Sequence, residues 1–343
     1  MLFRSVAKLD AYGFGKNAIT LLTSYLINRK QRVTTNSVYS DWKRVTKGVP
    51  QGSVLGPCLF NFFINDIFGF IREALLSNFA DDNTFTITGN TVAEVRQKLE
   101  IEVDQAISWF EFNLMQANPK KFKFMLLNSS ETETETNLKV RNTVIQSEDS
   151  VKLLGITIDN RLTFDKHIAT VCRKASCQMN VLMRFKRMLD IKAKTTIVKS
   201  FILSNFRYCS PVYHFCSRAN SNKMESILKR SLRFALNDTT STYEEMLKKV
   251  NLTTLEVDRL HFIVKEVYKI QHDEAPRYLA SLVKKRNIGY GTRQTLNLDI
   301  PRYKTVKYGK HSLKTLIPKL WNDLPRSCKA AETSDEFKKA IKS

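Results

Sequence analysis

Two adjacent aspartates, Asp81 and Asp82, stand in the segment SNFADDNTFTIT at residues 77–88, whose pattern predicts a strand, a tight turn and a second strand. Side chains alternate faces along a strand, so a turn is what allows neighbouring carboxylates to project close together. Two close carboxylates repel each other unless a cation neutralises them, and carboxylate oxygens suit Mg²⁺. The pattern therefore permits a metal site, although Asp-Asp-Asn is also ordinary turn chemistry.

A second candidate is the loop GVPQGSVLGP at residues 48–57, which precedes an apolar helix predicted to run to about Phe70. Glycines and prolines frame Gln51 and Ser53 in this loop. Backbone N–H groups at a helix N-terminus can approach a phosphate or a flat base, and Gly52 lacks the side chain that would block the approach. The alternative is a rigid loop that only turns the chain.

The surrounding elements alternate between strands and helices without a regular βαβ period, which favours an α+β fold over a doubly wound sheet. Thr91 and Glu94 form a capping-box pattern at the start of a long amphipathic helix that ends before Asn118. The other predicted elements are a helix within 9–30 that a Gly-rich turn opens, a strand over 31–39 with a turn at 41–42, strands over 121–127 and 151–158, helices over 164–236, and a strand-like segment near 296–303. The polar run SSETETETN at residues 129–137 is predicted to be a surface loop.

The net charge of +22 is unevenly distributed along the chain. Residues 1–150 hold 17 Lys+Arg and 16 Asp+Glu, whereas residues 151–343 hold 38 and 17, a net charge of +21. Such an excess favours a polyanionic partner. No window has the ~18 uninterrupted apolar residues of a membrane-spanning helix, so nucleic acid is favoured over a membrane.

The six cysteines are too sparse for a disulfide scaffold and fit a reducing intracellular compartment. A zinc site from Cys209, His214 and Cys216, with Cys172 or Cys177, is the alternative to buried free thiols. No signal peptide is evident at the start of the sequence.

Several segments together resemble the reverse transcriptases of non-LTR (LINE-type) retrotransposons. GVPQGSVLGPCLFNFFINDI and NFADDNT are similar to the family's motifs B and C. Trp109, Asn113 and NPKKFK at 118–123 resemble motif D, and KLLGI at 152–156 resembles motif E, the primer grip. The basic stretch 164–236 resembles the thumb, and YGKHSLKTLIPKLWNDLP resembles the ends of such reading frames.

The resemblance implies a fold, a reaction and a set of roles. The fold would be a partial right-hand polymerase palm at 1–160, a helical thumb-like region at 161–240 and a basic C-terminal extension at 241–343. The reaction would be two-metal nucleotidyl transfer with Mg²⁺, an RNA template, a DNA primer or hybrid duplex, and dNTP. The roles by residue are metal binding and catalysis (Asp81, Asp82), proton donation to pyrophosphate (Lys121, or Lys123), nucleotide and template binding (Pro50, Gln51, Gly52, Ser53), primer positioning (Leu154, Gly155), and nucleic-acid binding (Arg184, Lys186, Arg187, Arg207).

The family's motif A, an Asp-x-x-x-Ala-Phe-Asp type of run, is expected to lie just before the first residue of this sequence. Asp10 is expected to be a solvated helix charge and Asp66 a structural hydrogen-bonding residue, so neither replaces it. Because two metal ions need the motif A carboxylate, we expect this chain by itself to lack polymerase activity.

Two alternatives remain at this point. One is a non-catalytic RNA- or DNA-binding remnant, in which interleaved basic and aromatic residues such as those at 184–187 and 206–208 track a nucleic-acid strand. The other is a chain that does not fold stably, because its palm sheet would expose an edge. Nuclear residence would fit a retroelement protein, but the cluster Lys284-Lys285-Arg286 is too short to establish it. The sequence identifies no protein partner.

Overall fold

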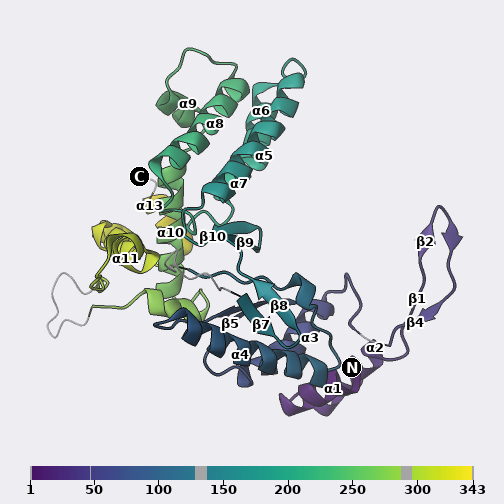
Figure 1. The fold of residues 1–343 in the computed structure, drawn as a ribbon. Coiled ribbons are helices and arrows are strands. Elements are labelled where there is room, and N and C mark those ends of the chain that lie inside the picture. The colour runs from purple at the N-terminus through teal and green to yellow at the C-terminus, as the bar shows by residue number, and fades with distance from the viewer. Residues whose placement is uncertain (1, 47, 128–136, 287–295, 342–343) are drawn as a thin grey trace. The chain divides into compact units, whose positions relative to one another are not determined.

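The computed structural model describes residues 2–46, 48–127, 137–286 and 296–341. The chain forms two compact units, Met1–Asp149 and Ser150–Ser343 (Figure 1). The expected boundaries at 160/161 and 240/241 stay predictions. The observed division places the segment that resembles motif E in the second unit, together with the helices that follow it.

The first unit mixes helices with short antiparallel strands, as the α+β prediction requires. Its helices are α1 Leu2–Ala11, α2 Lys16–Leu26, α3 Leu55–Ile64 and α4 Val92–Phe112, with 3₁₀ helices η1 Asn65–Gly69 and η2 Pro119–Lys121. Its strands are β1 Lys30–Gln31, β2 Thr34–Thr35, β3 Val38–Tyr39, β4 Lys43–Arg44, β5 Leu75–Phe79, β6 Asp82–Thr86, β7 Asn137–Val140 and β8 Thr143–Gln146.

Helix α4 provides the main apolar face of this unit. Thr91 caps its first turn by accepting a hydrogen bond from the Glu94 N–H, as the sequence predicted. The reciprocal half of the predicted capping box differs, because the Glu94 carboxylate accepts from the Asn90 N–H. Its buried hydrophobic residues fall into two clusters: Leu99 and Ile107 pack with β7 and β8, whereas Ala106 and Trp109 pack with α3, η1 and β5. One amphipathic helix thus fixes both the β7–β8 hairpin and the segments that hold the candidate site.

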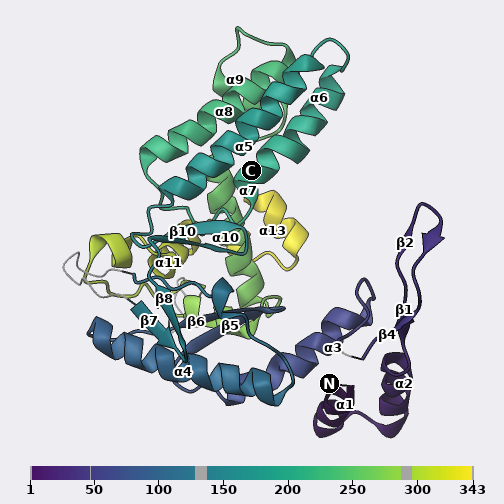
Figure 2. The same cartoon turned by 45° about the vertical axis from the view of Figure 1, so that its right-hand side comes forward.

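Among the described residues, the strands form separate antiparallel pairs and no larger sheet. The pairs in the first unit are β1–β4, β2–β3, β5–β6 and β7–β8. The β1–β4 and β2–β3 pairs build one hairpin that extends away from α2 in both views (Figures 1 and 2). Its tip is at Asn36–Ser37, so the predicted turn at Asp41–Trp42 is wrong. Both tip residues have positive φ, the geometry of a tight two-residue hairpin turn.

The second unit begins with the hairpin β9 Ser150–Leu153 and β10 Ile156–Asp159 and continues as helices. These are α5 Asp165–Arg184, α6 Ile191–Ile197, the π-helix η3 Val198–Ile202, α7 Leu203–Arg207, α8 Arg218–Leu236, α9 Tyr243–Lys249, α10 Leu255–Gln271, η4 Arg277–Leu282, the π-helix η5 Val306–Lys310, α11 Leu313–Asp323, α12 Arg326–Lys329 and α13 Ser334–Ala340.

Helix α10 joins two cores in this unit. Its first residue, Leu255, packs in the cluster formed by β10 and α5–α9, whereas Ile263 and Val267 pack with α11 and α13. The Phe337 ring of α13 stacks on Tyr268, with ring centroids 4.4 Å apart, and completes the second cluster. The predicted helical character of 164–236 is confirmed.

Several local predictions differ from the structure. Within the segment 9–30, the Gly-rich turn at Gly13, with a φ of 82°, precedes α2 as predicted, but residues 9–11 belong to the separate helix α1 and α2 ends at Leu26. The strand predicted over 151–158 is a hairpin that reverses at Gly155. The segments 121–127 and 296–303 each contribute only an isolated bridge, Phe124 with Ser147 and Leu298 with Lys285. Residues 129–136 of the predicted polar loop lie outside the described residues, and its last residue, Asn137, begins β7.

Within the described ranges, no helix combines the length and apolar character that a membrane crossing requires.

Candidate functional site

The paired aspartates lie at the tip of the β5–β6 hairpin, as the sequence predicted. Phe79 pairs with Asp82, so Ala80 and Asp81 form a two-residue turn. Ala80 has a φ of 52°, in the left-handed region that an alanine rarely adopts. The side chains of Asp81 and Asp82 are both exposed. The turn therefore presents two neighbouring carboxylates to solvent on a strained backbone.

Polar groups beside this turn lack partners. Asn78 and Asn83 face each other across the hairpin, two residues inside the tip. Among the described residues, the buried amide oxygen and nitrogen of Asn78 and the amide oxygen of Asn83 have no hydrogen-bond partner. The Asn83 amide nitrogen donates to the Asp81 carbonyl at 3.0 Å. Buried polar groups are normally satisfied, so this end of the hairpin has unused capacity for hydrogen bonds.

The donor chemistry of the turn fits a hard divalent cation, because Mg²⁺ usually takes one or two protein carboxylates and completes its shell with phosphates and water. The part of the chain that the structure describes contains no cluster of three or more His, Cys, Asp or Glu side chains suited to a metal ion. Asp66 does not join the pair, since it accepts a hydrogen bond from Lys8 at 2.7 Å, which matches its expected structural role. Asp10 is exposed on α1.

The loop before α3 is held by its own serine. The Ser53 hydroxyl donates to the Pro50 carbonyl at 2.7 Å and accepts from the Gly56 N–H at 3.0 Å. A Cβ on Gly56 would lie 2.8 Å from the Ser53 oxygen, so only glycine fits there. Gly52 has a φ of 77° and open space around it, and Gln51 is exposed. Gln51 and Gly52 are thus presented outward, whereas the Ser53 hydroxyl is engaged in shaping the loop.

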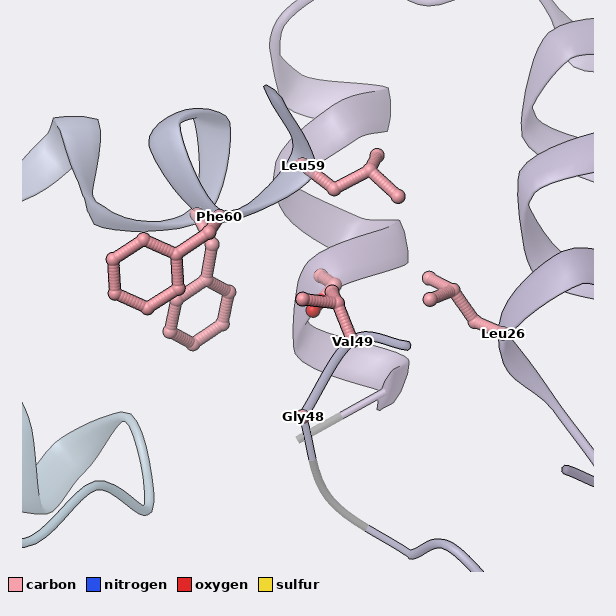
Figure 3. A pocket seen from close by; sticks show the side chains of 7 residues that line it. Leu26, Gly48, Val49, Leu59 and Phe60 are labelled. Carbon is pink, nitrogen blue, oxygen red and sulfur yellow. The ribbon is translucent and has the colours of Figure 1, made fainter. Parts of the chain in front are cut away.

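Val49 anchors this loop in a small apolar hollow between α1, α2 and α3. The hollow is lined by Leu26, Val49, Leu59 and Phe60, with Gly48 at its rim (Figure 3). Its volume of about 70 Å³ is far below the ~300 Å³ of the smallest usual ligand pockets, so it cannot hold a nucleotide. The hollow serves to seat the loop, and any nucleotide contact must use its outer surface.

One core supports both motifs. Phe63 of α3 and Ile67 of η1 pack in the same buried cluster as Leu76 of β5, together with Trp109 of α4. The loop at 48–54 continues directly into α3, and the Ala80–Asp81 turn continues from β5. Two segments that the sequence separates by about thirty residues are therefore fixed to one set of buried side chains.

The two candidate lysines differ in their surroundings. Lys121 ends the 3₁₀ turn η2 and is exposed, and Asn118 caps this turn by accepting from the Lys120 N–H. Lys123 forms an ion pair with Glu148 at 3.0 Å. Lys121 is therefore the better candidate for a proton donor, although its role stays a prediction.

The primer-grip candidates Leu154 and Gly155 form the turn of the β9–β10 hairpin. Both have positive φ, 45° and 86°. The Tyr208 hydroxyl donates to the Leu154 carbonyl at 2.7 Å, and a Cβ on Gly155 would lie 3.3 Å from the Tyr208 ring. The sequence marked Tyr208 only as one of several aromatic residues in a basic stretch, and nothing in its local pattern indicates this contact.

The four predicted nucleic-acid-binding residues fall into two settings. Arg184 ends α5, and Lys186 and Arg187 follow it in an exposed turn beside the half-exposed Phe185. Arg207 forms a bidentate ion pair with Asp258, at 2.7 and 2.9 Å. The basic side chains of the exposed turn can bind a phosphate directly, whereas Arg207 would first have to break or weaken its ion pair with Asp258.

The cysteines are free. Burial raises the pKa of the Cys172 and Cys216 thiols, which disfavours the thiolate that zinc would need. The described residues around Cys209, His214 and Cys216 form no metal cluster. The alternative of a zinc site therefore has no support in the geometry.

Comparison with known proteins identifies a family match and several relatives. Residues 4–158 match the family profile described as "Reverse transcriptase (RNA-dependent DNA polymerase)". The chain is 27% identical over 226 residues to the probable RNA-directed DNA polymerase from transposon BS of Drosophila melanogaster, covering 62% of this chain and 25% of that protein. It is 26% identical over 223 residues to the RNA-directed DNA polymerase from mobile element jockey of the same species, covering 62% and 24%.

A third relative comes from a different insect. The Pol polyprotein from type-1 retrotransposable element R1 2 of Nasonia vitripennis, described as retrovirus-related, is 24% identical over 180 residues, which cover 49% of this chain and 43% of that protein. The chain thus spans about a quarter of the length of the two Drosophila relatives.

In the first unit, the segments that carry the aspartate-pair hairpin and the glycine-rich loop share one core, and the reverse transcriptase match covers nearly all of this unit. Residues 4–158 thus match the reverse transcriptase family, and the chain is homologous to the RNA-directed DNA polymerases of Drosophila non-LTR retrotransposons.

Proposed function

We propose that this chain supplies the nucleotide-, template- and primer-contacting part of an RNA-directed DNA polymerase that works by two-metal nucleotidyl transfer. One observation carries the proposal: the Asp81–Asp82 turn and the Gln51–Gly52 loop belong to segments that share one buried core. The family match over residues 4–158 supports the same reaction.

Asp81 and Asp82 would hold divalent cations, and the exposure of both carboxylates leaves room for phosphate and water in the coordination shell. Bound Mg²⁺ would stabilise the attacking 3′-oxygen and the departing pyrophosphate. The outward-facing Gln51 and Gly52 would contact the incoming dNTP and the template, and Pro50 and Ser53 would shape their loop. Lys121 would protonate the pyrophosphate.

Nucleic acid would contact the second unit at two further places. The Leu154–Gly155 turn, held by Tyr208, would position the primer 3′ end. The exposed turn with Arg184, Lys186 and Arg187 would contact the backbone of the hybrid duplex, which fits the net charge of +21 on residues 151–343.

We further propose that the chain assayed alone does not extend a primer. The described residues bring two aspartates to the hairpin tip and no third metal-binding side chain to form a larger cluster. A two-metal site would need carboxylate ligands beyond this pair. Binding without synthesis is the second candidate function, and the exposed basic turn at 184–187 favours it.

The test is primer extension with Mg²⁺, dNTP and a DNA primer on an RNA template, beside anisotropy measurements of hybrid-duplex binding at several salt concentrations. Asp81→Ala and Asp82→Ala are compared with Asp10→Ala, which removes an exposed aspartate from α1. Binding that weakens steeply with salt, without extension, supports the proposal. Extension that Asp81→Ala abolishes would show that another carboxylate completes the site and would refute the inactivity. Absence of both activities would refute the proposed role in nucleic-acid binding.

A further inference from the structure

The hairpin at residues 29–45 is exposed along nearly its whole length. Every residue from Ile27 to Arg44 is exposed, and the strands β1–β4 contribute nothing to a buried cluster. Backbone pairing maintains the hairpin, with Lys30 opposite Arg44 and Thr34 opposite Tyr39. A two-stranded ribbon without a core is marginal in water, so this segment is built for something other than packing within its own unit.

Four large hydrophobic side chains on this hairpin are open to solvent. Tyr39 is 56% exposed and Trp42 59%, and Val33 and Val38 are more exposed still. The other two tryptophans of the chain, Trp109 and Trp321, are each 1% exposed. The contrast shows that Trp42 is not a displaced core residue but an aromatic ring presented on a surface.

The aromatic rings are paired with a cation. The Arg32 guanidinium lies over the Tyr39 ring at 4.0 Å and over the Trp42 ring at 4.7 Å. This arrangement holds both rings in place on one side while each keeps more than half of its surface open. Preordered aromatic rings beside a guanidinium form a stacking platform for a flat π system.

The charge of the hairpin selects the partner. Residues 29–45 contain Arg29, Lys30, Arg32, Lys43 and Arg44 against the single acid Asp41, a net charge of +4. The rest of residues 1–150 carries a net charge of −3, because these positions hold 12 Lys+Arg and 15 Asp+Glu. The cations are therefore concentrated on this hairpin within a unit that is otherwise acidic.

We propose that the hairpin at residues 29–45 binds a single-stranded nucleic acid, with unpaired bases stacking on Tyr39 and Trp42 and phosphates contacting the surrounding Lys and Arg side chains. An unpaired strand suits both the aromatic rings and the basic side chains, since its bases have free faces for stacking and its backbone carries a regular series of phosphates. A duplex hides the faces of its bases, and an acidic peptide has no bases to stack. The interaction is separate from the Asp81–Asp82 chemistry and does not depend on polymerase activity.

Trp42 provides a direct measurement. Bases that stack on an exposed tryptophan quench its emission, whereas the buried Trp109 and Trp321 serve as an internal background. The full chain is titrated with a 12-residue oligo-uridine, the DNA oligo-thymidine of equal length, and a blunt duplex of equal length. We expect both single strands to quench the emission of the exposed tryptophan and the duplex to leave it unchanged. A response to RNA alone would also support the proposal and would assign a contact to the 2′-hydroxyl.

Variants separate the hairpin from the basic second unit. Trp42→Phe should abolish the quenching. Tyr39→Ala should weaken the binding affinity that Trp42 emission reports by at least about fivefold, since removal of one stacked aromatic ring costs about 1 kcal/mol or more of binding free energy. Lys43→Gln with Arg44→Gln should weaken the same titration and reduce its salt dependence. The matched controls are Arg72→Gln with Lys139→Gln, which remove the same charge from exposed positions elsewhere in the first unit.

Each remaining outcome would overturn the proposal. The first is that oligonucleotides bind the chain but leave Trp42 emission unchanged. The second is that the duplex quenches this emission as strongly as the single strands do. The third is that Tyr39→Ala binds the single strands with the affinity of the parent chain. Circular dichroism of the hairpin variants should match the parent chain, because none of the substituted residues is buried.

Discussion

The hydroxyl of Tyr208 donates a hydrogen bond to the carbonyl of Leu154 at 2.7 Å, across 54 residues of sequence. It fixes a turn in which two successive residues have positive φ, an arrangement that a leucine adopts only with external support. Tyr208 follows α7 directly, so the helices of the second unit determine where the Leu154–Gly155 turn lies. If this turn contacts a primer end, Tyr208 is the residue that positions it.

Replacement of Tyr208 by Phe should lower the free energy of unfolding by about 0.5–1 kcal/mol, because the hydrogen bond is lost while the ring contact with Gly155 remains. The lower part of the usual range applies since Tyr208 is 53% exposed. Thermal unfolding followed by circular dichroism measures the change. Tyr278→Phe, at a 77% exposed tyrosine, is the control and should leave the melting temperature unaltered. Equal effects of both changes would contradict the assigned role.

Replacement of Gly155 by Ala should destabilise the chain more strongly, by about 1–2 kcal/mol, because a side chain at positive φ is strained. The new methyl group would also press on the Tyr208 ring at 3.3 Å. Gly69→Ala is the matched control, since that glycine has ordinary φ and nothing within 4 Å of an added Cβ. Denaturant titration compares the two variants, and a Gly155→Ala variant as stable as Gly69→Ala would refute the argument.

Replacement of Ser53 by Ala should cost about 1 kcal/mol, the usual loss when a helix-capping hydroxyl is removed. The Gly56 N–H would lose its acceptor, and the loop that presents Gln51 would lose its link to the Pro50 carbonyl. Ser53→Thr keeps the hydroxyl and should restore most of the stability. Chemical denaturation of the three chains distinguishes a capping role, in which threonine rescues, from a purely steric one, in which it does not.

Replacement of Ala80 by Val should destabilise the β5–β6 hairpin by about 1 kcal/mol or more, because a β-branched residue is strongly disfavoured at a φ of 52°. Ala80→Gly should be neutral or slightly stabilising, since the relief of strain offsets the greater entropy of the unfolded chain. Ser77→Val, at an exposed position within β5, is the control and should be tolerated. A higher melting temperature for Ala80→Val than for Ala80→Gly would contradict the inference that the turn is strained.

The buried His167 and the half-buried His214 predict a pH dependence of stability. Burial lowers the pKa of His167, and burial together with Arg259 lowers the pKa of His214, both from an ordinary value of 6.5. The unfolded chain takes up protons at these sites as pH falls through about 6.5, whereas the folded chain resists, so stability is lost on acidification. We expect the melting temperature to fall by a few degrees between pH 7.5 and 5.5.

The variant His167→Gln with His214→Gln should show a smaller decrease over this pH range, even if it is less stable overall. His272→Gln, at an exposed histidine, is the control and should retain the decrease. A melting temperature that is constant with pH in the parent chain would contradict the assignment.

The local sequence predicted the elements that carry the candidate chemistry. Alternation around Asp81 and Asp82 gave the β5–β6 hairpin, and the Thr91 cap gave the start of α4, because strand period, turn residues and capping bonds involve neighbours in sequence. The family resemblance carried by the residues at 48–57 and 79–82 is confirmed by the match over residues 4–158. The roles of the individual site residues stay predictions.

Other features depended on contacts between distant residues. The apolar run at 151–158 indicates one strand, yet the chain reverses at Gly155 and Tyr208 holds the turn. The sequence placed the turn of the first hairpin at Asp41–Trp42, and strand pairing placed it at Asn36–Ser37, which left Trp42 exposed beside Arg32. Composition and local pattern determined the family, the charge and most helices, because these properties are set residue by residue. Only the tertiary structure decided which aromatic rings are buried and which are presented, because burial is decided by residues far apart in the sequence.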